Sequence, residues 1–181
     1  MAELTLFCFF MVFYAYFGYP LLLLAFNLLR TGRTIAGSPP PAPEAYPPLT
    51  VIITVRNEEK VLRAKLEETL QLNYGADKVE ALLQQPASSV QLIVASDASD
   101  DATDDIVREF ASRGVELVRL RERGGKERAQ REAVSHARGE LIVFTDAKIS
   151  LNAEALNFFA AYFTSPEVGA VSSIDRVESA P

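Results

Sequence analysis

The hydrophobic and polar positions of the chain divide it into three stretches of different character. Residues 4–29 contain no charged side chain, and about 20 apolar residues are enough to span a bilayer. Residues 31–48 are rich in proline, glycine and alanine, a composition that favours extended structure over a packed core. From Leu49 onward, short apolar runs alternate with amphipathic segments, as in βαβ units. The pattern predicts a transmembrane helix at 1–30, a linker at 31–48 and an α/β domain at 49–181.

Within the domain, the pattern predicts a mostly parallel sheet with helices on both faces. The run at 92–95 has no polar alternation, so it is expected to be a strand buried on both faces. Further strands are expected at 49–55, 115–118, 140–145 and 168–172. Helices are expected at about 59–72, 77–85, 102–110, 126–137 and 152–163. Gly139 is expected to end the helix at 126–137 in a left-handed conformation.

A cleaved signal peptide is the alternative reading of the first segment. Such a peptide has a basic N-terminal region, a shorter apolar core and small residues at its cleavage site. Here the leading residues carry Glu3, and the first basic residues, Arg30 and Arg33, follow the apolar run. These features favour a retained membrane helix. By the positive-inside rule, the domain is then expected on the cytoplasmic side of the cell membrane.

Charge and residue counts exclude several classes of protein. The formal net charge of -6 argues against a nucleic-acid binder, because phosphate neutralisation needs clustered Lys and Arg. The chain has one cysteine, Cys8, and one histidine, which excludes an intrachain disulfide and leaves no zinc-ligand spacing. The concentrated basic stretch at 119–131 therefore needs a local explanation.

Polar side chains follow three of the predicted strands, in the segments 56–59, 96–97 and 145–146. The carboxyl ends of parallel strands lie at one edge of a sheet, where open α/β folds bind ligands. A basic loop, 121–126, precedes a helix whose N-terminal N–H groups favour an anion. Acids beside bases in one crevice indicate a phosphate bound with a divalent metal. Two plainer readings stay open: the run at 96–103 also suits a helix cap, and the basic loop a solvated helix start.

The familiar phosphate-binding motifs are absent. The segment Gly124-Gly125-Lys126-Glu127 lacks the first glycine of a P-loop and has Glu where Ser or Thr would bind magnesium. No GxGxxG follows the first strand, which argues against a nicotinamide-dependent dehydrogenase.

Four segments together resemble the family 2 glycosyltransferases, which have the GT-A fold. They are VIITVRNEE (51–59), IVASDASDDAT (93–103), RGGKERAQREAV (123–134) and GELIVFTDA (139–147). Their order and spacing match the family's NEE segment, its acidic DDxSxDxT-like segment, its GK-containing helix and its first metal-site aspartate. The membrane helix with Gly18-Tyr19-Pro20, followed by a Pro-rich linker, is similar to the membrane-anchored branch of the family.

The resemblance implies a site for a nucleotide-sugar donor, with UDP as the expected nucleotide. Val55, Arg56 and Asp97 would lie beside the base. Glu59 matches the second acid of the NEE segment, and Lys126 would lie near the diphosphate. Asp146 would hold Mg²⁺ or Mn²⁺ against that diphosphate, and the metal would neutralise charge on the departing group.

This sequence departs from the family pattern at two important places. Lys148 stands where the second acid of the DxD element would be, so a metal would depend on Asp146, phosphates and water. The family's inverting members use a later carboxylate as general base, and the resemblance would place it beyond Pro181. The chain is therefore expected to be the donor-binding half of a longer enzyme, with little or no transfer by itself.

The resemblance thus implies a membrane-anchored glycosyltransferase acting on a glycan or lipid-linked acceptor, in cell-surface polysaccharide or exopolysaccharide synthesis. The alternative is a catalytically inactive, membrane-tethered nucleotide-binding or scaffold module. Lys148 and the missing base favour this alternative, whereas Asp97, Lys126 and Asp146 count against it. A different α/β nucleotide enzyme is disfavoured by the absent phosphate motifs.

Overall fold

The computed structural model describes residues 2–29, 40–85 and 87–173, without the side chains of residues 27–29. The chain forms two compact units, Met1–Ser38 and Pro39–Pro181. The first contains α1 (Ala2–Phe13), the π-helical turn η1 (Tyr14–Gly18) and α2 (Tyr19–Leu29). Within the described residues, Ala2–Phe26 is the one helix long and apolar enough to cross a membrane, with a mean hydropathy of 1.9. Its large apolar side chains are exposed, as a membrane-compatible helix requires.

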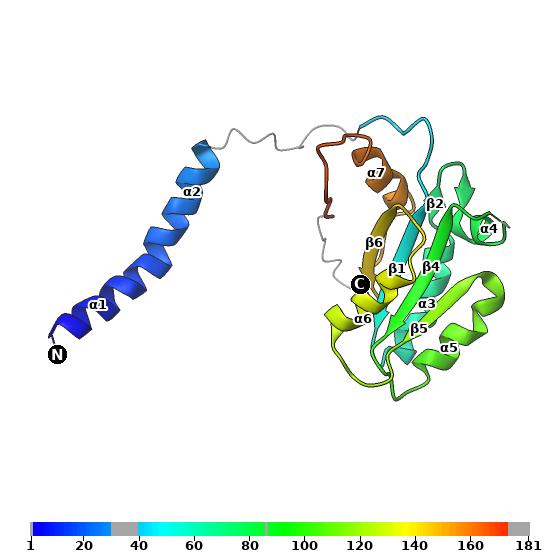
Figure 1. The fold of residues 1–181 in the computed structure, drawn as a ribbon, viewed down its shortest axis with the longest axis horizontal. Helices are drawn as coiled ribbons and strands as arrows, with labels where there is room; N and C mark the ends of the chain where they lie inside the picture. Colours follow the sequence, from blue (N-terminus) through cyan, green and yellow to red (C-terminus); the bar gives the residue numbers. More distant parts are fainter. Residues whose placement is uncertain (1, 30–39, 86, 174–181) are drawn as a thin grey trace, which may run out of the picture. The chain divides into compact units, whose positions relative to one another are not determined.

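The second unit is built on a four-stranded parallel sheet (Figure 1). Its strands are β1 (Leu49–Val55), β4 (Val90–Ser96), β5 (Val115–Arg119) and β6 (Leu141–Asp146), in the order β5-β4-β1-β6. The chain runs outward from β1 to β4 and β5, then returns to place β6 on the other side of β1. This reversal creates a crevice beyond the carboxyl ends of β1 and β6, the usual ligand position in such sheets.

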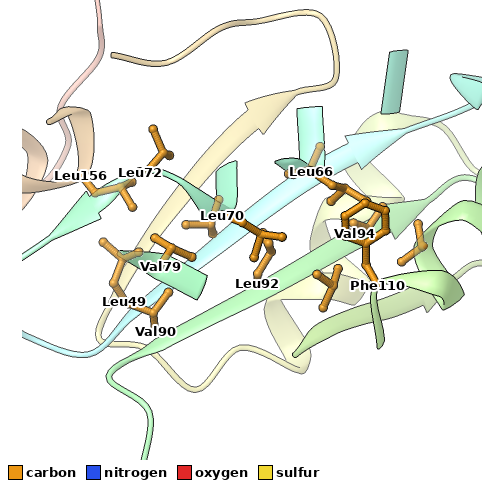
Figure 2. Packing of buried hydrophobic residues seen from close by; sticks show 14 of the residues in the cluster. Leu49, Leu66, Leu70, Leu72, Val79, Val90, Leu92, Val94, Phe110 and Leu156 are labelled. Carbon is orange, nitrogen blue, oxygen red and sulfur yellow. The ribbon is translucent and has the colours of Figure 1, made fainter. Parts of the chain in front are cut away.

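Side chains of the two central strands alternate between two hydrophobic clusters, one on each face. On one face, Val51 and Ile53 of β1 pack with α3 (Glu59–Leu70), α5 (Thr103–Glu109) and α7 (Ala155–Tyr162). Figure 2 shows Leu70 of α3 close to Leu92 of β4, and Leu66 close to Val94. On the other face, the smaller cluster contains Ile52, Ile93 and two alanines of α6 (Lys126–Ser135). Burial on both faces explains why these strands lack polar alternation.

The predicted α/β class and mostly parallel sheet are confirmed, but smaller elements differ from the prediction. A hairpin of β2 (Asn73–Tyr74) and β3 (Asp77–Lys78) precedes α4 (Val79–Leu83), and a short 3₁₀ turn, η2 (Ala111–Arg113), follows α5. The strand predicted at 168–172 is wrong: the described residues 163–173 contain no strand. An apolar run becomes a strand only where a neighbouring strand pairs with its backbone, and none pairs with this one in the described structure.

The segment before β1 is docked on the second unit. Residues 31–39 of the predicted linker lie outside the described residues, as do Met1 and Arg30 of the predicted transmembrane helix. Residues 40–48 contain no helix or strand. Tyr46 packs edge-on against Tyr74 at 5.1 Å, and the Tyr74 hydroxyl donates to the Pro47 carbonyl. The Pro48 carbonyl accepts from the backbone N–H groups of Glu140 and Leu141. The chain is therefore fixed to the domain from about Tyr46 onward.

The prediction for Gly139 is also wrong, because the glycine serves a different purpose. Helix α6 ends on His136 in the right-handed region, and Gly139 is not among the glycines with positive φ. A Cβ at Gly139 would lie 2.5 Å from the carbonyl carbon of Leu49 and from the nitrogen of Thr50. The Gly139 N–H also donates to the Thr50 hydroxyl at 2.9 Å. Glycine is required here because the chain passes directly against β1.

Glu154, at the start of α7, gives the fold a dependence on pH. Hydrogen bonds from the side-chain amides of Asn73 and Asn157 hold the pKa of Glu154 below its ordinary value of 4.5. Such a group adds stability above its unfolded pKa and loses it as pH falls through the lower folded pKa. We expect wild-type protein to melt above Glu154→Gln at pH 7, and the gap to close in acid below pH 4.5.

Thermal melts of the full chain in mild detergent test this expectation. Glu44→Gln is the control, since Glu44 is exposed and its carboxylate has no hydrogen bond or ion pair with any of the residues that the structure describes. Its melting temperature is expected to follow that of wild type at every pH. A gap between Glu154→Gln and wild type that stays constant from pH 7 into acid would contradict the role of Glu154.

Candidate donor site

A cleft of about 440 Å³ lies beyond the carboxyl ends of β1, β4 and β6. This volume is within the range of small-molecule sites. Its lining comes from the ends of β1 and β4, the basic loop before α6 and the turn after β6. The lining residues are Thr54, Val55, Arg56, Glu58, Asp97, Arg123, Gly125, Lys126, Asp146, Ala147, Lys148 and Ile149. Segments nearly 100 residues apart in sequence thus form one site.

Asp97, directly after β4, anchors the basic loop to the sheet. Its side chain is 6% exposed, and its carboxylate accepts hydrogen bonds from the backbone N–H groups of Gly124, at 2.6 Å, and Gly125, at 3.0 Å. A guanidinium nitrogen of Arg56 lies 3.9 Å away. Gly125 has a φ of 84°, a backbone conformation that favours glycine. Asp97 therefore fixes the loop that leads into α6, and Lys126 is the first residue of that helix.

Asp146, the last residue of β6, is paired with Lys126. The lysine ammonium lies 2.8 Å from one carboxylate oxygen and 2.9 Å from the other. Both side chains are partly exposed, so they remain open to exchange with a ligand. Lys148, two residues later, lies 2.8 Å from a carboxylate oxygen of Glu58. Each acid of the cleft thus has a cation or N–H partner.

The acidic run that follows β4, residues 97–105, is hydrogen-bonded to the turn after β1. The backbone N–H groups of Asn57, Glu58 and Glu59 donate to the side chains of Ser99, Thr103 and Asp101. Burial raises the pKa of Asp101, but hydrogen bonds from Thr103 and from the Glu59 backbone outweigh it and leave this pKa below the ordinary value. Most of the hydroxyls and acids in this run therefore have a structural role.

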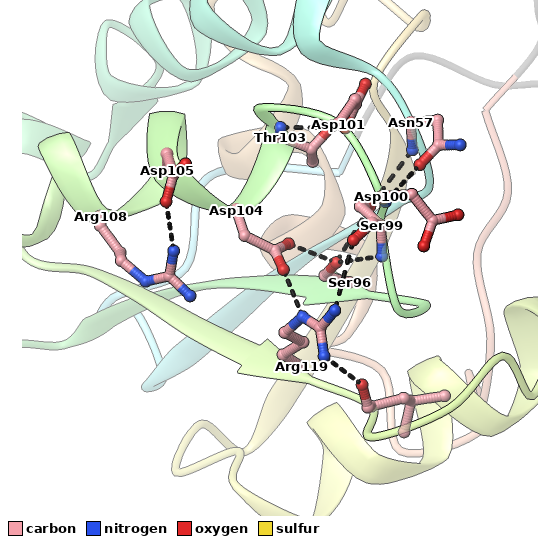
Figure 3. A network of polar contacts seen from close by, with 11 residues as sticks. Asn57, Ser96, Ser99, Asp100, Asp101, Thr103, Asp104, Asp105, Arg108 and Arg119 are labelled. Carbon is pink, nitrogen blue, oxygen red and sulfur yellow. Dashed lines mark hydrogen bonds and ion pairs between the residues drawn. The ribbon is translucent and has the colours of Figure 1, made fainter.

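A second set of contacts connects the same run to the ends of β4 and β5 (Figure 3). The buried carboxylate of Asp104 accepts from the Ser96 hydroxyl at 2.6 Å and from the Arg119 guanidinium at 2.5 Å. Arg119, the last residue of β5, also donates to the Ser99 carbonyl. These bonds tie the loop that carries Asp97 to the end of β5.

The structure brings together five of the six donor-site residues predicted from the sequence. Val55, Arg56, Asp97, Lys126 and Asp146 line the cleft. The sixth, Glu59, does not line the cleft. Glu59 is the first residue of α3, outside the lining, and its carboxylate accepts from the Ala102 N–H at 3.1 Å.

Its neighbour Glu58 lines the cleft instead. Asn57, between β1 and α3, has a φ of 53°. This left-handed turn decides which of the two acids faces the cleft.

Thr54 was not anticipated from the sequence. It lines the cleft, and its buried hydroxyl has no hydrogen-bond partner in the described structure. A buried polar atom without a partner is uncommon, which makes this hydroxyl a candidate ligand contact. Within the strand predicted at 49–55, a single threonine does not indicate this role.

Few of the described side chains are placed to bind a divalent metal together. The part of the chain that the structure describes has no group of three or more His, Cys, Asp or Glu side chains that could hold an ion. The residues therefore do not fit a cage made by protein alone. They fit the arrangement in which one or two carboxylates share the ion with substrate phosphates and water, with Asp146 as the carboxylate.

The model of the Glycosyl transferase family 2 matches residues 50–181. The chain belongs to glycosyltransferase family 2. The match begins one residue into β1 and includes every segment that lines the cleft. The resemblance inferred from the four motifs is therefore confirmed, and with it the prediction of an enzyme family.

Solved glycosyltransferases share the fold. A mannosyltransferase from Pyrobaculum calidifontis, in complex with GDP-Man and Mn²⁺, is 30% identical with a TM-score of 0.69, over 92% of this chain and 46% of that one. TarS of S. aureus, solved with UDP-GlcNAc, is 23% identical with a TM-score of 0.53, over 64% of this chain and 31% of that one. The predicted GT-A fold is confirmed by these similarities.

A curated relative is a beta-monoglucosyldiacylglycerol synthase of Synechocystis sp. It is 25% identical over 130 residues, which are 70% of this chain and 25% of the relative. The glycosyltransferase chain described here thus spans a quarter of this relative and under half of the mannosyltransferase.

Proposed function

We propose that this chain carries the donor-binding part of a membrane-anchored glycosyltransferase. In this proposal the cleft holds a nucleotide-sugar, and the whole enzyme transfers the sugar to a glycan or lipid-linked acceptor. The observation that carries the proposal is the meeting of Asp97, Lys126 and Asp146 in one cleft at the carboxyl ends of the strands. The family supplies the class of reaction.

The charges of the cleft support binding of a diphosphate. Arg123, Lys126 and Lys148 all line it. Lys126 also begins α6, and the first backbone N–H groups of a helix favour an anion. In the proposed pose the diphosphate lies toward these cations. The base lies toward Val55, Arg56 and Asp97.

We propose a UDP-sugar as the donor. The mannosyltransferase relative was solved with GDP-Man, so guanine nucleotides are the competitors that a test must include.

A bound Mg²⁺ or Mn²⁺ would supply positive charge to the departing diphosphate. Asp146 would hold the ion, together with donor phosphates and water. Lys126 would then exchange its contact with Asp146 for a phosphate oxygen, and Asp97 would keep the loop before α6 in place. Glu58, Asp97 and Asp146, the carboxylates lining the described cleft, are all paired. We therefore propose that the general base for the acceptor lies outside the described residues.

The apolar helix Ala2–Phe26 is the proposed membrane anchor, with the donor site in the cytoplasm. The curated relative is named as a glycolipid synthase, which supports an acceptor at a membrane surface. A glycan or lipid-linked acceptor in cell-surface polysaccharide synthesis is the form of the reaction that we propose.

Titration calorimetry on the detergent-solubilised full chain tests the donor site. The ligands are UDP, UDP-glucose, UDP-GlcNAc, GDP and GDP-mannose, each with Mn²⁺ and with EDTA. We expect a dissociation constant below about 1 mM for UDP and its sugars, weakened by EDTA. Tighter binding of GDP would replace uridine by guanosine in the proposal. No binding of any nucleotide by protein shown to be folded would overturn it.

A membrane-tethered module that binds nucleotide without transfer is the second candidate. The Lys148–Glu58 pair favours it, because the cleft has a cation where a second metal-binding acid is expected. Donor hydrolysis or transfer by the native full-length enzyme, with Lys148 intact, would exclude this candidate.

A further inference from the structure

Helix α3 contains a lysine whose side chain is only 2% exposed. Lys65 lies among buried leucines on the core-facing side of the helix, where packing alone would favour an apolar side chain. Its ammonium donates to the backbone carbonyl of Ile149 at 2.5 Å and lies 3.7 Å from the carboxylate of Glu68. Burial lowers the pKa of Lys65, and Glu68 offsets this only in part.

Glu68, one turn later, holds the same segment. One of its carboxylate oxygens accepts from the Ser150 hydroxyl at 2.8 Å and from the Leu151 N–H at 2.7 Å. Lys65 and Glu68 therefore bind three consecutive residues, 149–151. We call these two side chains and their bonds the α3 clamp.

The clamped segment is continuous with the cleft. Ile149 lines the cleft together with Asp146, Ala147 and Lys148. Its N–H donates to the Asp146 carbonyl at 3.2 Å, which closes a turn. The carbonyl held by Lys65 and the N–H that closes this turn belong to the same residue. A movement of Ile149 would therefore move Asp146 and Lys148.

Stability alone is a poor reason for the α3 clamp. Removing a cation from water is costly, and well-packed apolar residues often replace buried ion pairs without loss of stability. What an apolar residue could not do is hold a backbone carbonyl at a fixed point. Exact placement matters at this site, because displacements of about 1 Å in a reacting site cost up to about 100-fold.

We propose that Lys65 and Glu68 are positioning residues, which fix the turn after β6 so that Asp146 and Lys148 face the donor's diphosphate. This inference rests on the proposed donor site. Neither residue lines the cleft, so each acts through the segment 149–151.

The test compares Lys65→Met with Leu70→Val in the detergent-solubilised full chain. Leu70 is a fully buried residue of the same helix, and its shortening removes stability but leaves both side chains of the α3 clamp in place. UDP and GDP are titrated with Mn²⁺ and with EDTA, and melting temperatures are recorded. Lys65→Met is expected to weaken Mn²⁺-supported binding at least about 10-fold and to reduce the factor by which Mn²⁺ strengthens binding. Leu70→Val should leave both quantities within about two-fold of wild type.

The outcomes distinguish failure of the proposed donor site from failure of the α3 clamp. If wild type binds neither nucleotide, the donor site fails. If wild type binds and Lys65→Met keeps both its affinity and its metal factor, the clamp is overturned. Equal losses in Lys65→Met and Leu70→Val would also overturn it, because they would follow stability. If Lys65→Met does not fold, Glu68→Gln decides, since it keeps the lysine and weakens two bonds to the segment. Unchanged metal-supported binding in Glu68→Gln would then overturn the clamp.

Discussion

Asp146→Asn is expected to weaken binding of UDP in the presence of Mn²⁺ by about 100-fold. Asp146 is the carboxylate proposed to share the ion with the donor, and Lys148 stands where a second acid would be. A neutral amide binds a divalent cation much more weakly than a carboxylate does, so the variant would lose the ion that neutralises the diphosphate. The expected loss is about 3 kcal/mol, in the range of charge stabilisation by a bound metal. Calorimetric titration of wild type and variant, with Mn²⁺ and with EDTA, measures the effect.

Asp100→Asn is the matched control. Asp100 carries the same functional group at the rim of the site, is 77% exposed, and lies 3.7 Å from Arg56. Its change alters net charge equally but leaves the proposed ligand in place, so binding should fall by less than about three-fold. Without metal, Asp146→Asn should bind UDP at least as well as wild type, because Lys126 is then free of its ion pair. If Mn²⁺ strengthens binding equally in Asp146→Asn and wild type, Asp146 is not the ligand.

The long elements of the domain were predictable because their sequences satisfy one requirement each. A strand covered by helices on both faces needs a continuous apolar run, and 51–53 and 92–95 have it. A helix on one face needs apolar residues three or four apart, as in Leu62, Leu66 and Leu70. These requirements are local in sequence, so the elements, and with them the sheet's carboxyl edge, follow from the pattern.

Features that depend on distant partners were not predictable. The two-residue strands of the hairpin before α4 are too short to show a period. Gly139 follows a helix, so its position in the sequence predicts a helix cap. In the structure it allows close contact with Thr50 of β1, which is 89 residues away. The apolar run at 168–172 suits a strand in composition, but composition does not supply a neighbouring strand.

The same distinction applies to the site. The sequence places Asp97, Lys126 and Asp146 at strand or helix ends, which meet in any parallel sheet of this order. It does not reveal that Asp97 holds two glycine N–H groups 27 and 28 residues later. Nor does it tell Glu58 from Glu59, because their directions depend on the left-handed Asn57. The α3 clamp was invisible for a related reason: a lysine in a helix is normally read as exposed.

Gly139→Ala is expected to destabilise the domain by about 3 kcal/mol, the upper part of the range for overpacking, which lowers the melting temperature by about 10 °C. The new Cβ would lie 2.5 Å from two backbone atoms of β1. Backbone of a central strand yields less easily than a side chain, because Leu49 is paired with Val90 on one side and Leu141 on the other. Thermal melts of the full chain in mild detergent measure the loss.

Gly169→Ala is the control for this change, since nothing lies within 4 Å of a Cβ at that position, and its melting temperature should stay within about 2 °C of wild type. The clash in Gly139→Ala lies at the amino ends of β1 and β6, opposite the cleft. Below its melting transition, Gly139→Ala should therefore bind UDP with unchanged affinity. A melting temperature equal to that of wild type would show that the chain can move away from β1. Lost affinity in the folded variant would show instead that strain at one end of these strands reaches the donor site at the other.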